Sequence, residues 1–447
     1  MTTPSIVRRL SPVALAAGLL PLACAGVSHA QCISFDWSQN APTTVLRSQD
    51  AGGDWVAYGS ADNGTVPIYS KFTPVPTLLT TLRSPVPNAP IAWRFGWVVS
   101  IDAPWIAISE PSRPPADGFN AAGAVLLFRY DGTNFIHSGT TNPPNNGSFA
   151  PYGFKMDLDY PWVAVVSDRD SPADTPRVHL HEHVGGTWVF RQSILLDSLA
   201  SSLAVNGNDL FVTVTGPSGS LQVDTYRLAN GSWDFQQTIT PSLQASPFGP
   251  SIATEGEWLV VGAPSGSAPN GNVGRAYIYR NVAGVWTQNT VLTPPSNIFG
   301  GTFGDVVTID QDRIAVLFRN LSLNNWVVLV YRQFLPGQWA FEATAAPNPP
   351  GFVAHGEEFI SLNGSRLFTV GRSSTNSNDV IGAHTLNGIL VGDANGDGMV
   401  EFEDITELLS LLGEPVPPFR SGDSNGDGFI TFTDITAVLS NFGAACP

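Results

Sequence analysis

A hairpin-containing unit recurs along most of the chain, and this recurrence restricts the fold more than any other feature of the sequence. Each hairpin has an alternating apolar segment, a tight polar turn and a second apolar run. Seven copies occupy residues 45–61, 98–111, 155–168, 203–217, 251–264, 306–319 and 360–372. A further strand in each unit ends in a ring-bearing residue, namely Tyr69, Phe128, His181, Tyr226, Tyr279, Tyr331 and His384. These landmarks lie 45 to 59 residues apart, a period typical of solenoids and propellers.

A fourth strand is expected in each unit, because a turn glycine precedes an aromatic strand. Trp188, Trp233, Trp286 and Trp339 hold this place, and Phe135 holds it in an earlier copy. Four short strands with polar turns are the signature of a propeller blade. The last unit lacks its fourth strand, whereas the segment 33–37 precedes the first unit and belongs to none. The sequence therefore predicts a mainly β, seven-bladed β-propeller over residues 31–388, closed by the N-terminal strand.

The Phe-Gly pairs at 95–96, 248–249 and 303–304 carry a family resemblance. Together with the surrounding repeats, most clearly 248–294, they resemble bacterial FG-GAP repeats of the short type. This resemblance implies a seven-bladed propeller related in architecture to the integrin α-subunit head. Calcium-binding FG-GAP repeats carry an acidic loop in the hairpin turn. The turns here, such as 254–257, are too short to surround a cation with six or more oxygens, so we predict no calcium in the blades.

Two acidic loops thirty residues apart form the sharpest motif of the chain, at 393–404 and 423–434. Each has the twelve-residue spacing of a calcium loop, with a glycine where the sharp turn needs it, Gly398 or Gly428. Side-chain or backbone oxygens at loop positions 1, 3, 5, 7, 9 and 12 favour Ca²⁺ over softer metals. The predicted ligands of two calcium ions are Asp393, Asn395, Asp397, Met399, Glu401 and Asp404, and Asp423, Asn425, Asp427, Phe429, Thr431 and Asp434.

A short helix is expected after each loop. Ile405, Leu408, Leu409 and Leu412 have helical spacing, as do Ile435, Val438, Leu439 and Phe442, and we expect the two stripes to pack against each other. Gly413 and Gly443 mark the helix ends.

These tandem loop–helix units over 391–447 resemble a type I dockerin, a small all-α module. The resemblance implies calcium-dependent folding and binding to a cohesin-like protein through loop positions 10 and 11, which are Phe402, Glu403, Phe432 and Thr433. The ending 442–447 resembles a dockerin variant that anchors secreted proteins at the cell surface.

Residues 1–30 have the features of a secretory signal peptide. Arg8 and Arg9 precede a short apolar run, and Ser28–Ala30 resembles a cleavage site. That run is too short to span a bilayer, and no other stretch of the chain would. The protein is therefore expected to be secreted or held at the cell surface. Export permits a disulfide between Cys32 and Cys446, but processing of Cys446 for anchoring is equally compatible with the sequence.

The charge balance and the scattered polar groups restrict the function. A net charge of −16 is the reverse of what a nucleic-acid-binding protein usually shows. The alternating His179, His181 and His183 could bind zinc, but they align with blade-packing positions. The acidic pairs at 157/159, 168/170 and 255/257 could serve a glycosidase, but turn chemistry alone explains them.

The leading hypothesis is a non-enzymatic exported protein whose propeller presents an interaction surface, with a dockerin for attachment. Two alternatives stay open. One is a carbohydrate-active enzyme, a glycoside hydrolase or lyase, or a polysaccharide-binding subunit in polysaccharide breakdown. The other is a structural adhesion protein. The ligand on the propeller would be a polysaccharide or a protein.

Overall fold

The computed structural model describes most of the repeat region and parts of the C-terminal module. The described residues are 33–40, 46–71, 76–114, 123–144, 151–167, 175–243, 247–267, 273–295, 298, 300–320, 325–345, 352–353, 359–373, 379–386, 394, 399–415, 423 and 429–444. Residues 1–32, the predicted ligands Asp393, Asn395, Asp397, Asn425 and Asp427, and the cysteines Cys32 and Cys446 lie outside them.

Short antiparallel strands in sheets of four make up the first part of the chain, and each strand pairs with its neighbour in sequence. The first sheet contains β2 (Ser48–Gly52), β3 (Trp55–Gly59), β4 (Val66–Ser70) and β5 (Thr77–Leu82). The second contains β6 (Val99–Asp102), β7 (Trp105–Glu110), β8 (Ala124–Tyr130) and β9 (Phe135–Thr141), and the one-turn helix η1 (Ile91–Trp93) precedes it. The next two contain β10 (Tyr152–Asp159), β11 (Trp162–Ser167), β12 (Arg177–Val184) and β13 (Thr187–Leu195), then β14 (Ser202–Asn206), β15 (Asp209–Thr215), β16 (Leu221–Ala229) and β17 (Ser232–Ile239).

The following eight strands form one sheet that consists of two antiparallel runs. The runs are β18 (Ile252–Glu255), β19 (Trp258–Ser267), β20 (Val273–Val282) and β21 (Val285–Leu292), then β22 (Gly301–Asp310), β23 (Arg313–Asn320), β24 (Asn325–Leu335) and β25 (Gln338–Ala345). A short parallel pairing between β20 and β22, at Gly274 and Phe303, joins them. Each run thus keeps the four-strand pattern of the other sheets.

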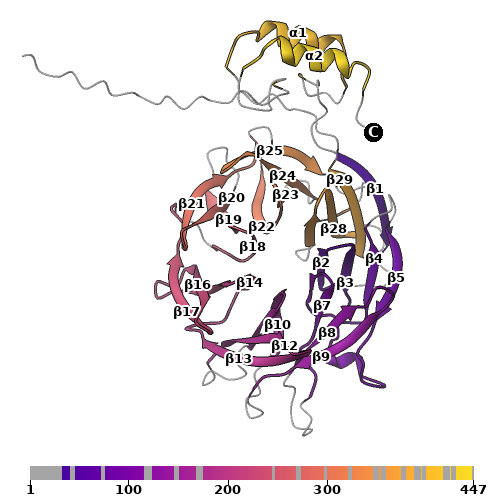
Figure 1. Cartoon of the computed structure of the whole chain (residues 1–447), viewed down its shortest axis with the longest axis vertical. Coiled ribbons are helices and arrows are strands. Elements are labelled where there is room, and N and C mark those ends of the chain that lie inside the picture. The colour runs from indigo at the N-terminus through magenta and orange to yellow at the C-terminus, as the bar shows by residue number, and fades with distance from the viewer. Residues whose placement is uncertain are drawn as a thin grey trace, which may run out of the picture.

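The last sheet combines the two ends of the repeat region. It contains β26 (Phe352–Val353), β27 (Phe359–Asn363), β28 (Arg366–Ser373) and β29 (Asp379–Leu386), and β1 (Ile33–Asn40) pairs antiparallel with β29. Figure 1 shows the sheets arranged around a central axis as a β-propeller, with β1 beside β29. The N-terminal strand therefore occupies the outer place that the sequence left vacant in the last unit.

The apolar core lies between neighbouring sheets. One cluster joins Trp55 and Ile68 of the first sheet with Ile106 and Leu126 of the second, and the same arrangement recurs around the ring. Side chains on both faces of the second strands, such as β7 and β11, are covered, as the alternation predicted, whereas outer strands such as β13 and β17 are largely exposed. Each sheet is thus packed against its neighbours, and the last sheet packs on the first through Tyr58, Tyr69 and Phe368.

The landmark residues of the third strands each sit beside a β-bulge. The pairing of third and fourth strands shifts register at Tyr69, Phe128, His181, Tyr226, Tyr279 and Tyr331, and the pairing of β1 with β29 shifts opposite His384. A bulge bends and twists the outer strand. The recurring aromatic therefore marks the point at which the outer strand curves over the blade.

Packing explains why phenylalanine and glycine stand next to each other in the Phe-Gly pairs. Phe95, Phe248 and Phe303 are buried in the inter-sheet core. Gly304 has a φ of +102°, and a Cβ there would lie 2.4 Å from the carbonyl oxygen of Arg275. Only glycine allows this approach to the neighbouring backbone.

Two nine-residue helices, α1 (Phe402–Ser410) and α2 (Phe432–Ser440), form the C-terminal module. Reciprocal backbone bonds join the units, since Gly443 donates to Val400 O and Gly413 donates to Ile430 O. The small core contains Ala394, Val400, Leu408, Ile430 and Val438, with Ile405 and Ile435 packed against it.

The expected packing of two full apolar stripes is wrong in part. Leu409, Leu412, Leu439 and Phe442 are exposed. The loop residues Val400 and Ile430 are buried in the small core instead, and of the two stripes only Leu408 and Val438 are fully buried. Among the residues that the structure describes, no helix is long and apolar enough to cross a membrane.

Candidate functional site

The predicted calcium loops end in the first turn of each helix. Met399, Glu401, Asp404, Asp423, Phe429, Thr431 and Asp434 are the predicted ligands that the structure describes. Asp404 and Asp434 are fully buried, and Asp423 is 2% exposed. Loop positions 1 and 12 of the second loop are thus both carboxylates removed from solvent.

The position-12 carboxylates also cap the helices. Asp404 is the third helical residue of α1, and its Oδ2 accepts the N–H of Glu401 at 2.7 Å. Asp434 does the same for Thr431 in α2, at 2.9 Å. In addition, Asp404 Oδ1 accepts the N–H of Ala394, the second residue of the loop, at 2.7 Å. The Asp404 carboxylate therefore connects the beginning of the first loop to its end through hydrogen bonds.

The residue types fit a calcium ion at these loops. A carboxylate oxygen that accepts one hydrogen bond keeps a further lone pair for a metal, and buried carboxylates need pairing or a cation. Residues 391–447 contain a single basic residue, Arg420, against ten acidic ones: Asp393, Asp397, Glu401, Glu403, Asp404, Glu407, Glu414, Asp423, Asp427 and Asp434. No protein cation of this module can balance that charge, whereas two divalent ions would offset four of the nine net negative charges.

The predicted partner-binding positions are on the surface. Phe402 and Phe432 are 68% and 73% exposed, and Glu403 and Thr433 are exposed beside them. The same helical positions are exposed in both units, so an equivalent apolar ring stands next to each loop.

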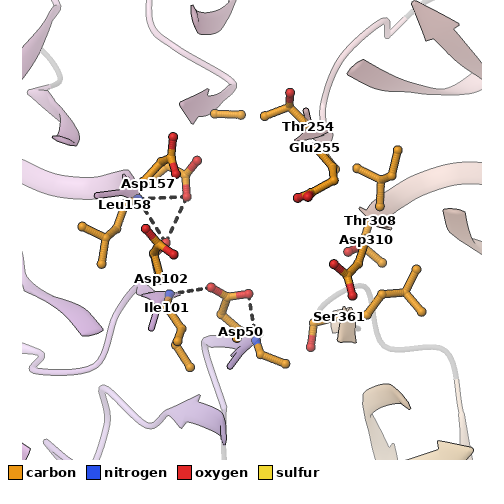
Figure 2. A pocket seen from close by; sticks show the side chains of 18 of the residues that line it. Asp50, Ile101, Asp102, Asp157, Leu158, Thr254, Glu255, Thr308, Asp310 and Ser361 are labelled. Carbon is orange, nitrogen blue, oxygen red and sulfur yellow. Dashed lines mark hydrogen bonds between the residues drawn. The ribbon is translucent and has the colours of Figure 1, made fainter. Parts of the chain in front are cut away.

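A second candidate site is the central cavity of the propeller, of about 430 Å³. The strands β2, β6, β10, β14, β18, β22 and β27 line it, and no Lys, Arg or His is among the described lining residues. Six carboxyl groups line it, from Asp50, Asp102, Asp157, Asp159, Glu255 and Asp310. Figure 2 labels all of them except Asp159. Of the acidic pairs expected from the sequence, 157/159 and Glu255 thus share one cavity, while 168 and 170 lie outside the described residues.

Most of these carboxylates bind the backbone of the next sheet. Asp50 Oδ2 accepts the N–H of Ile101 at 2.6 Å, and Asp157 Oδ2 accepts that of Val205 at 2.8 Å. Three further carboxylates accept from the following hairpin turn, in the pairs Asp102–Tyr160, Asp159–Gly207 and Asp310–Gly364. The interpretation as local turn chemistry is therefore incomplete, because these acids connect sheets.

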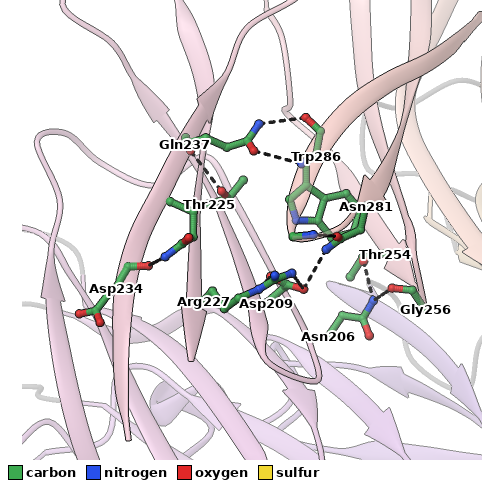
Figure 3. Close-up of polar contacts among 12 residues, drawn as sticks. Asn206, Asp209, Thr225, Arg227, Asp234, Gln237, Thr254, Gly256, Asn281 and Trp286 are labelled. Atoms are coloured by element: carbon green, nitrogen blue, oxygen red, sulfur yellow. Dashed lines mark hydrogen bonds and ion pairs between the residues drawn. The ribbon is translucent and has the colours of Figure 1, made fainter. Parts of the chain in front are cut away.

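Neutral side chains make equivalent connections. Asn206 donates to Gly256 O at 2.8 Å, and Gln237 bonds both the N–H and the C=O of Trp286 on the next outer strand (Figure 3). Gln192 clamps Trp233 in the same way.

Burial in the ring disfavours ionisation of the cavity acids. It raises the pKa of Asp50 to about 7 and that of Asp157 to about 6, against the hydrogen bonds that each carboxylate accepts. The pKa values of Asp102 and Asp159 are raised by the same cause. For Glu255, burial and then the charges of Asp310, Asp159 and Asp102 raise the pKa.

The histidines have packing roles. Nδ1 of His179 lies 2.8 Å from Ser193 Oγ, and Nε2 of His181 lies 3.0 Å from Tyr152 OH. His183 packs on Trp105 with ring centroids 4.7 Å apart. Burial lowers the pKa of His179 to about 4 and that of His181 to about 3. Within the described part of the chain, no three His, Cys, Asp or Glu side chains are grouped to hold a metal ion.

Comparisons with known proteins reach the fold alone. No family model matches the chain, and no curated protein sequence matches it. A chain of the mitotic checkpoint complex aligns over 79% of this chain and 95% of its own length, with 10% identity and a TM-score of 0.51. The β-propeller domain of the Trilobed protease from Pyrococcus furiosus aligns over 78% and 98%, with 10% identity and a TM-score of 0.48. Sqt1 of Saccharomyces cerevisiae aligns over 79% and 99%, with 9% identity and a TM-score of 0.44.

Sequence reasoning did not single out Asp50, Asp102 and Asp310. A signal was present, because Asp102, Asp159, Glu255 and Asp310 all occupy the last position of a first strand. Asp50 stands two residues before that position, like Asp157.

Proposed function

We propose that the chain is an exported binding protein made of a seven-bladed FG-GAP-type propeller and a calcium-dependent dockerin-like module. We count seven blades by treating the eight-stranded sheet as two blades, each of the four-stranded sheets as one, and the sheet that contains β1 as the last. The propeller provides an interaction surface. The module attaches it to a cohesin-like or cell-surface protein.

The repeated environment of Asp404 and Asp434 carries this proposal. Both are fully buried, both close a twelve-residue acidic loop and both cap a nine-residue helix. Two Ca²⁺ ions bound by 393–404 and 423–434 would supply the positive charge that the module lacks. Residues 1–30 would direct export.

Calcium binding to the exported chain, residues 31–447, tests the metal part. Calorimetric titration should give two ions per chain. Asp393→Ala should remove one site, and combination with Asp423→Ala should remove both. Glu407→Gln, an acid of α1 outside the ligand set, is the matched control and should keep both. A chain that takes up no calcium at millimolar concentration would refute the proposal.

The partner part has its own test. If Phe402 and Phe432 contact a protein, replacing both by Glu should abolish calcium-dependent retention on envelope proteins of the source organism, while calcium stoichiometry stays at two. Unchanged retention would place the contact elsewhere.

A further inference from the structure

A cavity of about 240 Å³ lies apart from the central one, beside the connection between β5 and β6. Its lining includes Asn63 and Gly64 from the turn before β4, Arg83 and Ser84 after β5, and Glu110 at the end of β7. Phe95 and Ile91 add apolar surface. The site therefore forms where the first two sheets meet.

Glu110 is the exceptional group of this cavity. Its side chain is fully buried, and its Oε1 accepts no hydrogen bond from the residues that the structure describes. Buried polar atoms are nearly always paired in folded proteins, and an unpaired carboxylate oxygen is costly. Burial raises the pKa of Glu110, although Ser84 and Arg113 oppose this. The cavity thus holds an acceptor oxygen, Oε1, that no described residue satisfies by hydrogen-bond geometry, although the Ser84 hydroxyl is close enough to the carboxyl group to lower its pKa.

The charges around the cavity indicate which kind of ligand it would bind. Arg113 Nη1 lies 3.5 Å from Oε2 of Glu110 and already faces that charge. A second ammonium or guanidinium near Oε1 is therefore disfavoured, and a neutral hydroxyl is the better donor. Arg83 is exposed at the same cavity and has no ion-pair partner among the described residues. The Arg83 guanidinium is therefore suited to bind a carboxylate group of a ligand.

We propose that this cavity binds a small hydroxylated carboxylate of about the size of one uronic acid residue, with a hydroxyl donating to Glu110 Oε1 and the carboxylate on Arg83. The volume is below the roughly 300–1,000 Å³ of pockets for drug-sized ligands, so it limits the ligand to one sugar-sized unit. This site lies on the propeller and is independent of calcium binding by the C-terminal module.

Ligand-observed NMR on the exported chain tests the proposal with D-glucuronate, D-galacturonate, D-glucose and glycine as probes. We expect saturable millimolar binding of at least one uronate. D-glucose, which lacks the carboxylate, should bind about tenfold more weakly or not at all, since a charge-assisted pair is lost. No saturable uronate binding, or equal binding of D-glucose or glycine, would overturn the proposal.

Variants locate the site. Arg83→Gln changes an exposed residue, so the fold should persist while uronate affinity falls about tenfold or more. Glu110→Leu should have a similar effect on affinity, with a melting curve to verify folding. Arg191→Gln, on the outer strand β13, is the matched control and should bind like the parent. Uronate binding that survives in Arg83→Gln would exclude this cavity.

Discussion

The propeller and the C-terminal module use carboxylates in opposite ways. In the propeller, Asp50 and Asp157 accept backbone N–H groups from the next sheet, and burial raises their pKa values. In the module, Asp404 and Asp434 close two acidic loops of a segment, 391–447, whose sequence has Arg420 as its single basic residue. The first arrangement is made within the protein, whereas we propose that calcium ions complete the second. The half-buried Asp50 and Asp157 thus have a structural role between sheets, whereas the fully buried Asp404 and Asp434 are proposed to depend on a ligand.

The largest expected effect concerns the closure of the propeller. Removal of residues 33–40 would expose the edge of β29 and remove the strand that links the last sheet to the first along the chain, while the core between these two sheets would remain. We expect the melting temperature of the propeller to fall by about 10 °C or more, with increased self-association. Scanning calorimetry and light scattering measure both. Calcium uptake by the module should be unchanged, and a propeller that melts normally would show that β1 is dispensable.

The next effect is confined to the module. Leu408 is fully buried, so Leu408→Ala should cost about 2–5 kcal/mol, enough to unfold a core of this size. Leu409→Ala is the matched control, since Leu409 is 55% exposed and should cost little. Hydrogen exchange at α1 reports the difference. Equal effects of the two variants would contradict the observed packing.

A smaller effect is expected from one clamp between sheets. Gln237→Ala removes two hydrogen bonds to the backbone of Trp286 and should cost about 1–3 kcal/mol in unfolding free energy. Gln236→Ala, at the exposed neighbouring residue, is the control and should change the unfolding free energy little. Denaturant titration distinguishes them, and a neutral Gln237→Ala would mean that water replaces the clamp at no cost.

The smallest effect depends on pH. The pKa of Asp50 is raised from 3.8 to about 7 on folding, so its contribution to stability is fully present below about pH 3.8 and is lost as the pH rises through about 7. Asp50→Asn should therefore flatten the fall in melting temperature between pH 5 and pH 8. Asp54→Asn, at an exposed position in the next turn, is the control. Parallel pH profiles for Asp50→Asn and the parent would contradict a buried, proton-binding Asp50.

The repeat unit made much of the propeller predictable. Four strands per unit and a ring residue in each third strand are local patterns, and the orphan segment 33–37 indicated the pairing with β29. Periodicity could not show that a bulge accompanies each landmark such as Tyr226. It also could not show that Leu409 stays exposed, because helix length and loop packing decide which stripe is covered.

The sites were predictable to different degrees. The acidic loops are continuous in sequence, so spacing alone identified them, and the calcium remains a prediction. The carboxylates of the central cavity come singly or in pairs from strands such as those of Asp50 and Asp310, which are far apart in sequence. The cavity at Glu110 depends on one buried atom without a partner, and no sequence pattern reports that.

Hydrogen exchange of the exported chain with calcium and with a chelator tests the contrast between the two regions most directly. Our account predicts that chelation abolishes protection in α1 and α2 and leaves the strands of the propeller unchanged. Helices that stay protected without calcium would contradict it, and so would a propeller whose strands lose protection with them.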